Sequence, residues 1–216
     1  AADNYPFMVL TAYLLDKDLY LGILEDMLNS EKKLTSRVGS LPDIYSFTKK
    51  DFKNEKVDMG NIIFGASEYV KDGLMPLNEF IGPSPWQDRM IDIVESLYTH
   101  INDFDSLEKY FKMSNNIEEI NGEMLQTLSR VYWMTGNQNY LDWAIKIADY
   151  YLLESDLSEV EYLKLRDHGC EIIGGLSELY MTLHLLSNEK KFEYQPPFYR
   201  LLDRILAYGR NPDGFF

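Results

Sequence analysis

The sequence is poor in cysteine and in positive charge, and it has no long apolar run. Cys170 is its single cysteine, which excludes an intramolecular disulfide framework and a multi-cysteine metal site. With 21 Lys and Arg against 35 Asp and Glu, the net charge is −14, and this charge repels phosphate backbones and anionic membrane surfaces. The apolar stretch 6–15 is interrupted by Thr11 and falls short of the ~20 residues that span a bilayer. We therefore expect neither nucleic acid nor a membrane among the partners.

Signatures of cofactor and metal chemistry are also missing. The sequence has no glycine-rich phosphate loop, and its three histidines do not form the i, i+4 pair of a zinc-binding helix. Cys170 follows His168 by two residues, a spacing that points the two side chains to different parts of a helix and disfavours a thiol nucleophile. We expect no cofactor and no bound metal.

What the sequence does have is helical periodicity along most of its length. Apolar residues recur at helical spacing, for example at Leu141, Ala144 and Ala148 and at Ile172, Leu176 and Leu179. The pattern predicts eight helices, at about 5–15, 18–32, 60–80, 85–101, 119–135, 138–153, 168–187 and 197–209. Segment 33–58 lacks this pattern and is long for a connection in a helical domain, so we expect a long loop or small hairpin beside a cleft.

The predicted helices form pairs, and the pairs repeat. A short polar turn that ends in an aromatic ring joins the two helices of each pair, with rings at Tyr20, Trp86, Tyr140 and Phe192. A polar motif opens the first helix of each pair. A periodic array of helical hairpins is typical of a solenoid or of a closed toroid.

Two stretches carry a resemblance to a known architecture. Residues 134–144 read MTGNQNYLDWA, which is similar to the turn between an inner and an outer helix of (α/α) toroids, and residues 166–176 read RDHGCEIIGGL. The chain resembles the six-hairpin glycosidases and the related polysaccharide lyases and sugar epimerases. The resemblance implies an all-α fold in which antiparallel helical hairpins build an (α/α) toroid or part of one.

The number of hairpins departs from this pattern. The sequence contains four predicted hairpins where a closed toroid of this type has six. We therefore expect a single toroid-type domain over 1–216 that is an incomplete part of a larger chain, with the remaining hairpins of that chain as its partners.

In such a toroid the polar motifs at the starts of the inner helices meet at one end, which makes Asp167, His168 and Glu171 the catalytic candidates. Asp167 and Glu171 are four residues apart and share a helix face, so their repulsion can raise one pKa and leave the other low. His168 moves protons near neutral pH. The structural alternative is equally open: Asp167 caps the helix, Arg166 neutralises the pair and His168 makes one hydrogen bond.

Further polar motifs supply candidate substrate-binding residues. These candidates open predicted inner helices or lie within them, and they are Arg166, Asn121, Glu123, Lys71, Asp72 and Asp3. Each has a plain structural interpretation as well, since Asn121 can cap a helix and Lys71 with Asp72 can form a solvated ion pair.

The leading functional hypothesis is a carbohydrate-active enzyme of the glycoside hydrolase type, which cleaves glycosidic bonds by carboxylate acid/base chemistry. Tyr and Trp rings, within an aromatic content of 14%, would stack on the sugar. A polysaccharide lyase or sugar epimerase is the enzymatic alternative, with His168 as the proton carrier and Arg166 or Lys71 neutralising a uronate. A non-catalytic helical scaffold that binds a glycan or a protein is the third possibility.

Overall fold

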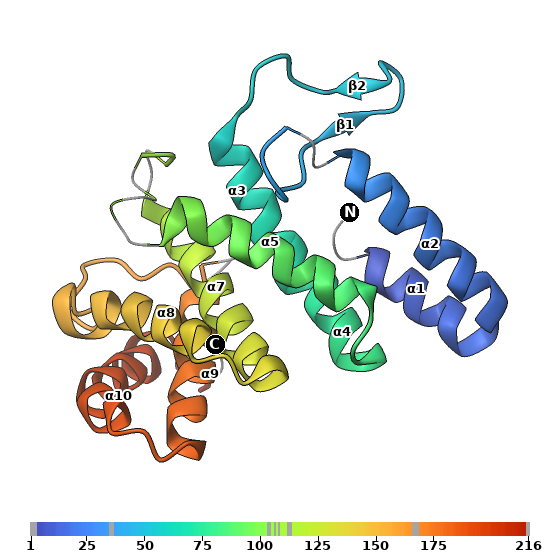
Figure 1. Ribbon diagram of the computed structural model, residues 1–216. Helices are drawn as coiled ribbons and strands as arrows, with labels where there is room; N and C mark the ends of the chain where they lie inside the picture. The colour runs from blue at the N-terminus through green and yellow to red at the C-terminus, as the bar shows by residue number, and fades with distance from the viewer. Residues whose placement is uncertain are drawn as a thin grey trace. The chain divides into compact units, whose positions relative to one another are not determined.

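The computed structural model describes residues 4–34, 37–102, 105, 107, 109–111, 114–165 and 169–214, with only the backbone described at 4–7, 32–34 and 114–116. The chain divides into two compact units, Ala1–Glu123 and Met124–Phe216, and each is considered by itself. The described part of the chain is mostly helical, which confirms the all-α prediction (Figure 1).

The first unit is built mainly from helices and one short hairpin. Its elements are α1 (Asn4–Leu15), α2 (Lys17–Leu34), β1 (Tyr45–Ser46), β2 (Asp51–Phe52), α3 (Met59–Glu68), the π-helical turn η1 (Tyr69–Leu74), α4 (Met75–Ile81) and α5 (Pro85–Ile101). The first half of α7 (Ser114–Thr135) completes it. α1 packs against α2 and α4, and α5 packs against α3, η1 and α4. The core between these helices includes Ile63, Leu74, Trp86, Met90 and Leu97, all fully buried.

The second unit consists of paired helices joined by short turns. Its elements are the second half of α7, α8 (Gln138–Asp149), the π-helical turn η2 (Tyr150–Glu154), α9 (Glu171–Leu185) and α10 (Lys190–Tyr208). The apolar stripes predicted for α8 and α9 are buried, as the burial of Leu141, Ala148, Ile172, Leu176 and Leu179 shows.

Local signals in the sequence set several helix ends as expected. The Ser84 hydroxyl accepts the Trp86 N–H at 3.2 Å and caps α5, with Pro85 at the first helical position. Gly136 ends α7 at a φ of 68°, and Asn137 caps α8 by accepting the N–H of Asn139 at 3.1 Å. Each of these contacts satisfies a helix-terminal group that would otherwise lack a partner.

The start of the last helix differs from the prediction. α10 begins at Lys190 and contains Pro196 and Pro197, whereas the sequence predicts a start at the two prolines. The Asn188 side chain accepts the Lys190 N–H at 2.9 Å, and the Tyr194 hydroxyl donates to the Asp149 carboxylate at 2.8 Å. These contacts stabilise a first turn of α10 that lies before the two prolines. The preference of proline for the first helical position therefore does not decide where α10 begins.

Two glycines in helical surroundings are expected to respond oppositely to an added methyl group. Gly136→Ala forces a side chain into the left-handed region and should lower the free energy of unfolding by about 1 kcal/mol. Gly22→Ala, within α2 where a Cβ meets nothing within 4 Å, should raise it by about 1 kcal/mol. Urea unfolding of both variants measures the two signs; equal signs would contradict the backbone assignment.

Segment 33–58, expected as a long loop or small hairpin, contains the antiparallel pair β1–β2, with Tyr45 opposite Phe52 and Ser46 opposite Asp51. Arg37 makes several contacts within this segment. Its Nη1 donates to the Asn54 carbonyl at 2.8 Å and lies 3.1 Å from Asp43 Oδ2, and its guanidinium covers the Phe52 ring. The Arg37 guanidinium therefore links the hairpin to the residues on either side of it.

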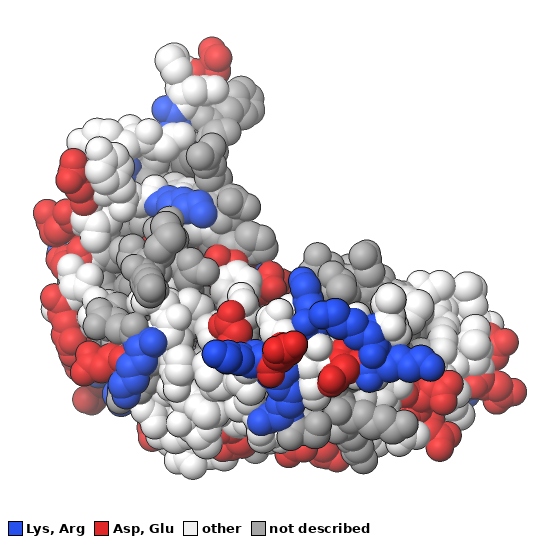
Figure 2. All heavy atoms as spheres, turned by 90° about the horizontal axis from the view of Figure 1, so that it is seen from above, with Lys and Arg blue, Asp and Glu red and all other residues white. Residues whose placement is uncertain are grey.

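The charge distribution on the surface is mixed where it can be seen. On the face shown in Figure 2, Lys and Arg side chains near the centre lie beside Asp and Glu side chains. A nucleic-acid surface needs clustered cations with free charge, and neighbouring carboxylates weaken the field that phosphates would meet.

Candidate functional site

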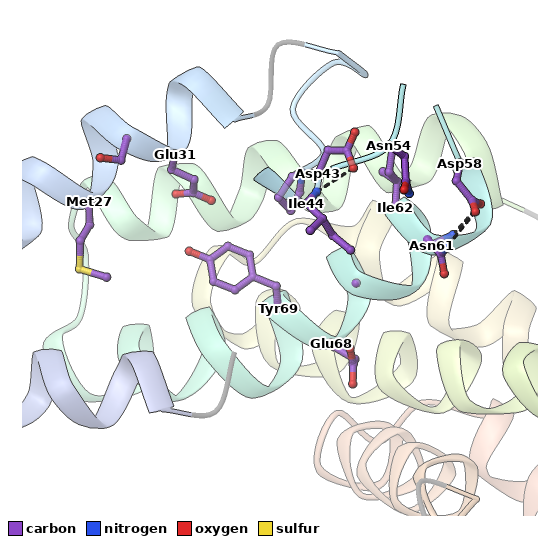
Figure 3. Close-up of a pocket in the computed structure, with 13 residues that line it drawn as sticks. Met27, Glu31, Asp43, Ile44, Asn54, Asp58, Asn61, Ile62, Glu68 and Tyr69 are labelled. Atoms are coloured by element: carbon purple, nitrogen blue, oxygen red, sulfur yellow. Dashed lines mark hydrogen bonds between the residues drawn. The ribbon is translucent and has the colours of Figure 1, made fainter. Parts of the chain in front are cut away.

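A cavity of about 530 Å³ lies in the first unit. α2 contributes one wall, the segment from Pro42 to Asp58 contributes a second, and α3 with the first residue of η1 contributes the third. Met27, Ile44 and Ile62 give it apolar surface (Figure 3). Its size and mostly apolar walls with a few polar groups are usual for a small-molecule site.

Glu31 on α2 is the most deeply buried carboxylate of the cavity wall. It is 7% exposed, and its Oε1 lies 2.9 Å from Arg89 Nε, a group that is itself nine-tenths buried. Burial raises the pKa of Glu31, and the Arg89 guanidinium and the Tyr69 hydroxyl oppose that shift without cancelling it. Figure 3 shows the Tyr69 hydroxyl directed toward Glu31 across the cavity. A carboxyl in this environment holds its proton more readily than one in water.

The second wall presents Asp43 and the Asn54 amide, and the third wall adds the Asn61 amide. Asp43 Oδ1 accepts the Ile44 N–H at 2.7 Å, while its other oxygen pairs with Arg37. Asn54 and Asn61 also line the cavity. These groups accept and donate hydrogen bonds around a space that is otherwise apolar.

Asp58 is the N-cap of α3, the helix that forms most of the third wall. Its carboxylate caps α3 by accepting the Asn61 N–H at 3.2 Å, and it accepts the Asn61 Nδ2 at 2.7 Å. An N-cap carboxylate is stabilised by the helix dipole, so the same contact starts the helix and holds a negative charge at the cavity edge.

A second group of carboxylates lies where α3 meets η1 and α7. Glu123 on α7 is fully buried, and neither of its oxygens makes a hydrogen bond of regular geometry. Burial raises the pKa of Glu123 to about 9; the Ser67 hydroxyl opposes the shift, and the charges of Asp72, Glu119 and Glu68 add to it. Glu123 is therefore neutral at physiological pH. π-Helical turns such as η1 are frequent at functional sites.

The structure brings together part of the residue set that the sequence singled out. Lys71 and Asp72 form an ion pair of 2.9 Å in η1, and Asp72 acts electrostatically on Glu123. Asn121 is buried on the same helix as Glu123. The polar motifs around 71 and 123, distant in sequence, therefore meet within one unit.

The remaining predicted residues lie elsewhere or outside the described part of the chain. Glu171 is the first residue of α9 in the second unit, where it accepts the Gln126 Nε2 at 2.6 Å. Outside the described residues lie Asp3, Arg166, Asp167 and His168. The predicted pairing of Asp167 with Glu171 stays a prediction.

Sequence reasoning missed Glu31 and Tyr69. Glu31 lies in a helix rich in charged residues, and nothing in its neighbourhood marks it as buried. Its partner Arg89 is 58 positions away, so only the packing of α2 near α5 reveals the pair. The one usable signal was the length of segment 33–58, which does form a wall of the cavity.

No protein-family model, curated protein or solved structure matches this chain. Among the described residues, no group of three or more His, Cys, Asp and Glu side chains is arranged to hold a metal ion. In the same part of the chain, no helix has the length and apolar character that crossing a bilayer requires. The cavity of the first unit is therefore the feature from which a function can be proposed.

Proposed function

We propose that the first unit binds a saccharide in the 530 Å³ cavity and cleaves a glycosidic bond by carboxylate acid/base chemistry. The observation that carries the proposal is Glu31, a nine-tenths buried carboxyl on the cavity wall whose pKa is raised by burial. Glycoside hydrolysis needs one carboxyl that is still protonated at working pH and one that is ionised.

The rest of the lining suits a sugar. Asn54 and Asn61 can exchange hydrogen bonds with hydroxyl groups, and the Tyr69 ring offers an apolar face on which a pyranose can stack. Ile44 and Ile62 add apolar surface to the lining. One tyrosine ring beside amides and carboxylates supplies a stacking face and hydrogen-bond partners for a saccharide.

In the proposed reaction Glu31 donates its proton to the leaving glycosidic oxygen as the bond to the anomeric carbon breaks. An ionised carboxylate, drawn from Asp43, Asp58 and Glu68, activates the attacking water or attacks the anomeric carbon itself. Tyr69 positions the Glu31 carboxyl and tunes its pKa.

The lining favours hydrolysis over the lyase and epimerase alternatives. Abstraction of a proton next to a uronate carboxylate requires a cation that neutralises that carboxylate. The described lining residues include four acids and no Lys or Arg, and Lys71 is engaged by Asp72. A uronate would meet like charge in this cavity.

We also propose that the helical hairpins belong to an (α/α) toroid of the six-hairpin type. The pairs α1–α2, α7–α8 and α9–α10, each joined by a short polar turn, support this. In that arrangement Asp167 and His168 would stand at the mouth of the toroid, and alanine variants of both belong in the activity assay below.

The test is a screen of the whole chain against oligosaccharides of neutral, cationic and anionic sugars, with release of reducing ends and calorimetric binding as readouts. We expect binding in the micromolar to millimolar range and slow, pH-dependent release of reducing ends from at least one of them. Failure to bind any member of the panel would overturn the proposal; binding without release would leave a glycan-binding scaffold.

A further inference from the structure

We propose that a groove in the second unit binds a neutral saccharide, with the Trp133 indole as the surface on which a sugar ring stacks. The groove has a volume of about 320 Å³, within the range of small-ligand sites. The second half of α7 contributes Arg130 and Trp133 to it, and α9 contributes Glu178, Met181 and Leu185. This site does not depend on the proposed catalytic cavity of the first unit.

Trp133 is held in a fixed orientation although half of its side chain is exposed. Its indole N–H donates to the hydroxyl of the buried Thr182 at 3.1 Å, and the Tyr132 ring meets it edge to face with the ring centroids 5.6 Å apart. Because the N–H is bonded within the protein, the 52% of the side chain that stays exposed is mainly ring carbon. An aromatic face that is ordered in advance loses little conformational entropy when a ligand stacks on it.

Arg130 and Glu178 place hydrogen-bonding groups in the same groove. Arg130 Nε donates to Glu178 Oε2 at 2.8 Å and its Nη2 donates to Oε1, so the two side chains form a bidentate pair. About a third of each side chain is exposed. An ionised carboxylate has about four lone-pair positions, so the Glu178 oxygens can accept further bonds from sugar hydroxyls. The opposite charges balance within the lining, which favours a ligand without charge.

Ser129 gives a separate indication of a ligand. It is 2% exposed and lines the groove, and within the described residues its hydroxyl makes no hydrogen bond. A buried hydroxyl without a partner lowers stability, and most buried polar groups of native proteins have one. A sugar bound in the groove can supply that partner, directly or through a bridging water.

The mixture of surfaces selects the class of ligand. A purely apolar ligand would remove water from the Arg130–Glu178 pair and return no hydrogen bond. A sugar has a face of C–H groups for Trp133 and hydroxyls at its edge for the pair, so it satisfies both. A protein partner of ordinary size needs roughly 800 Å² on its side, and a groove with three partly exposed apolar side chains offers a fraction of that.

Trp133 also gives a signal that is specific to this site. The chain has three tryptophans, and Trp86 and Trp143 are buried, so acrylamide quenching of the fluorescence reports mainly on Trp133. The probes are cellotetraose, mannotetraose, xylotetraose and tetra-N-acetylchitotetraose. We expect at least one of them to reduce the quenching constant about twofold at saturation, because a stacked sugar covers one face of the indole. The effect should be the same at 20 and 500 mM salt, since a neutral ligand is not screened.

Variants test the residues that make up the groove. Trp133→Ala should weaken calorimetric binding of the active tetrasaccharide about tenfold, and Glu178→Gln should weaken it several-fold because hydrogen bonds to a charged acceptor are the stronger ones. Phe192→Ala removes an exposed ring of the same unit outside the groove and is the matched control, which should leave the affinity unchanged. Far-UV circular dichroism confirms that the variants are folded, and the quenching measurement on the parent chain needs no variant.

The outcomes separate this groove from the cavity of the first unit, whose described lining contains no tryptophan. Protection of Trp133 that survives Tyr69→Ala would support the groove even if the proposed cleavage fails. Binding that Tyr69→Ala abolishes and Trp133→Ala leaves unchanged would place the saccharide in the first unit and overturn the inference. Absence of protection by all four tetrasaccharides would overturn it as well. So would protection that appears without sugar as protein concentration rises, because a second copy of the chain would then cover Trp133.

Discussion

Glu31→Gln is expected to lower the rate of glycoside cleavage by a factor of about 10²–10⁴, the range that a positioned general acid contributes. Gln occupies the same volume and its oxygen can still accept a hydrogen bond from Arg89, but it has no proton to give. Because the leaving oxygen then departs without protonation, the loss falls on kcat, while binding of the saccharide should change little. Initial rates and calorimetric binding measure the two effects separately.

The control for this prediction is Glu25→Gln, an exposed position on the same helix and outside the cavity, which should retain full activity. Far-UV circular dichroism confirms that the Glu31 variant is folded. A variant that binds and cleaves as the parent chain does would exclude Glu31 as the proton donor.

Tyr69→Phe tests whether the Tyr69 hydroxyl tunes the pKa of Glu31, because a purely structural role of Tyr69 would leave the pH–rate profile unchanged. The hydroxyl lowers the pKa of Glu31, so its removal should raise that pKa further. Activity depends on the protonated acid and falls as pH rises through this pKa. The basic limb of the pH–rate profile should therefore shift to higher pH in the variant, while the stacking ring is retained.

Glu123→Gln should make the protein more stable at pH 8. It should also remove the part of the pH dependence of the unfolding free energy that comes from ionisation of Glu123. The pKa of Glu123 is about 9 in the folded chain, whereas an unfolded chain has the ordinary glutamate value near 4.5. Between these values the folded state holds a proton that the unfolded state lacks. The contribution of protonated Glu123 to the free energy of unfolding is therefore fully present below about pH 4.5. It is lost as pH rises toward 9, by up to about 1.4 kcal/mol per pH unit.

A glutamine at 123 has no proton to lose, so the difference in unfolding free energy between variant and parent should grow with pH across this interval. At pH 8 we expect a gain of about 2 kcal/mol, since burial of the amide offsets part of the larger gain from removing the carboxyl. Urea unfolding at several pH values from 5 to 9 gives this difference directly. A difference that stays flat with pH would show that Glu123 titrates normally.

The sign of this prediction bears on function. A residue that lowers the stability of the fold near neutral pH is not retained for its contribution to stability. Functional sites are the places where sequences depart from the most stable residue. Glu123 lies beside a π-helical turn and the negative group that includes Glu68 of the cavity. We expect the stabilised variant to change the pH dependence of cleavage even though residue 123 is fully buried.

Local chemistry in the sequence was sufficient to predict the helices and many of their ends. Apolar residues at helical spacing predicted the buried stripes of α8 and α9, and Ser84, Gly136 and Asn137 set the expected caps. These features depend on neighbours within a few positions, so a linear pattern contains them. The start of α10 was missed because Asn188 and the distant Asp149 anchor its first turn ahead of the prolines.

The site was only partly visible in the sequence. The motifs around Lys71, Asp72 and Glu123 were singled out, and the fold places them together, but their pattern gave no sign that Glu123 would be fully buried and neutral. Burial of a charge depends on what packs over it, which periodicity within one helix does not show. The candidates Asp167 and His168 lie outside the described residues and stay predictions.

By itself the sequence determined the all-α class, the paired helices and the net charge of −14, because composition and spacing alone set these properties. Tertiary structure alone decided where the cavity lies and which acids line it. Glu31, Asp43 and Asp58 come from separate stretches, and the partner Arg89 comes from a further helix. A carboxyl acquires a raised pKa only when packing removes its water, and that packing exists only in the folded chain.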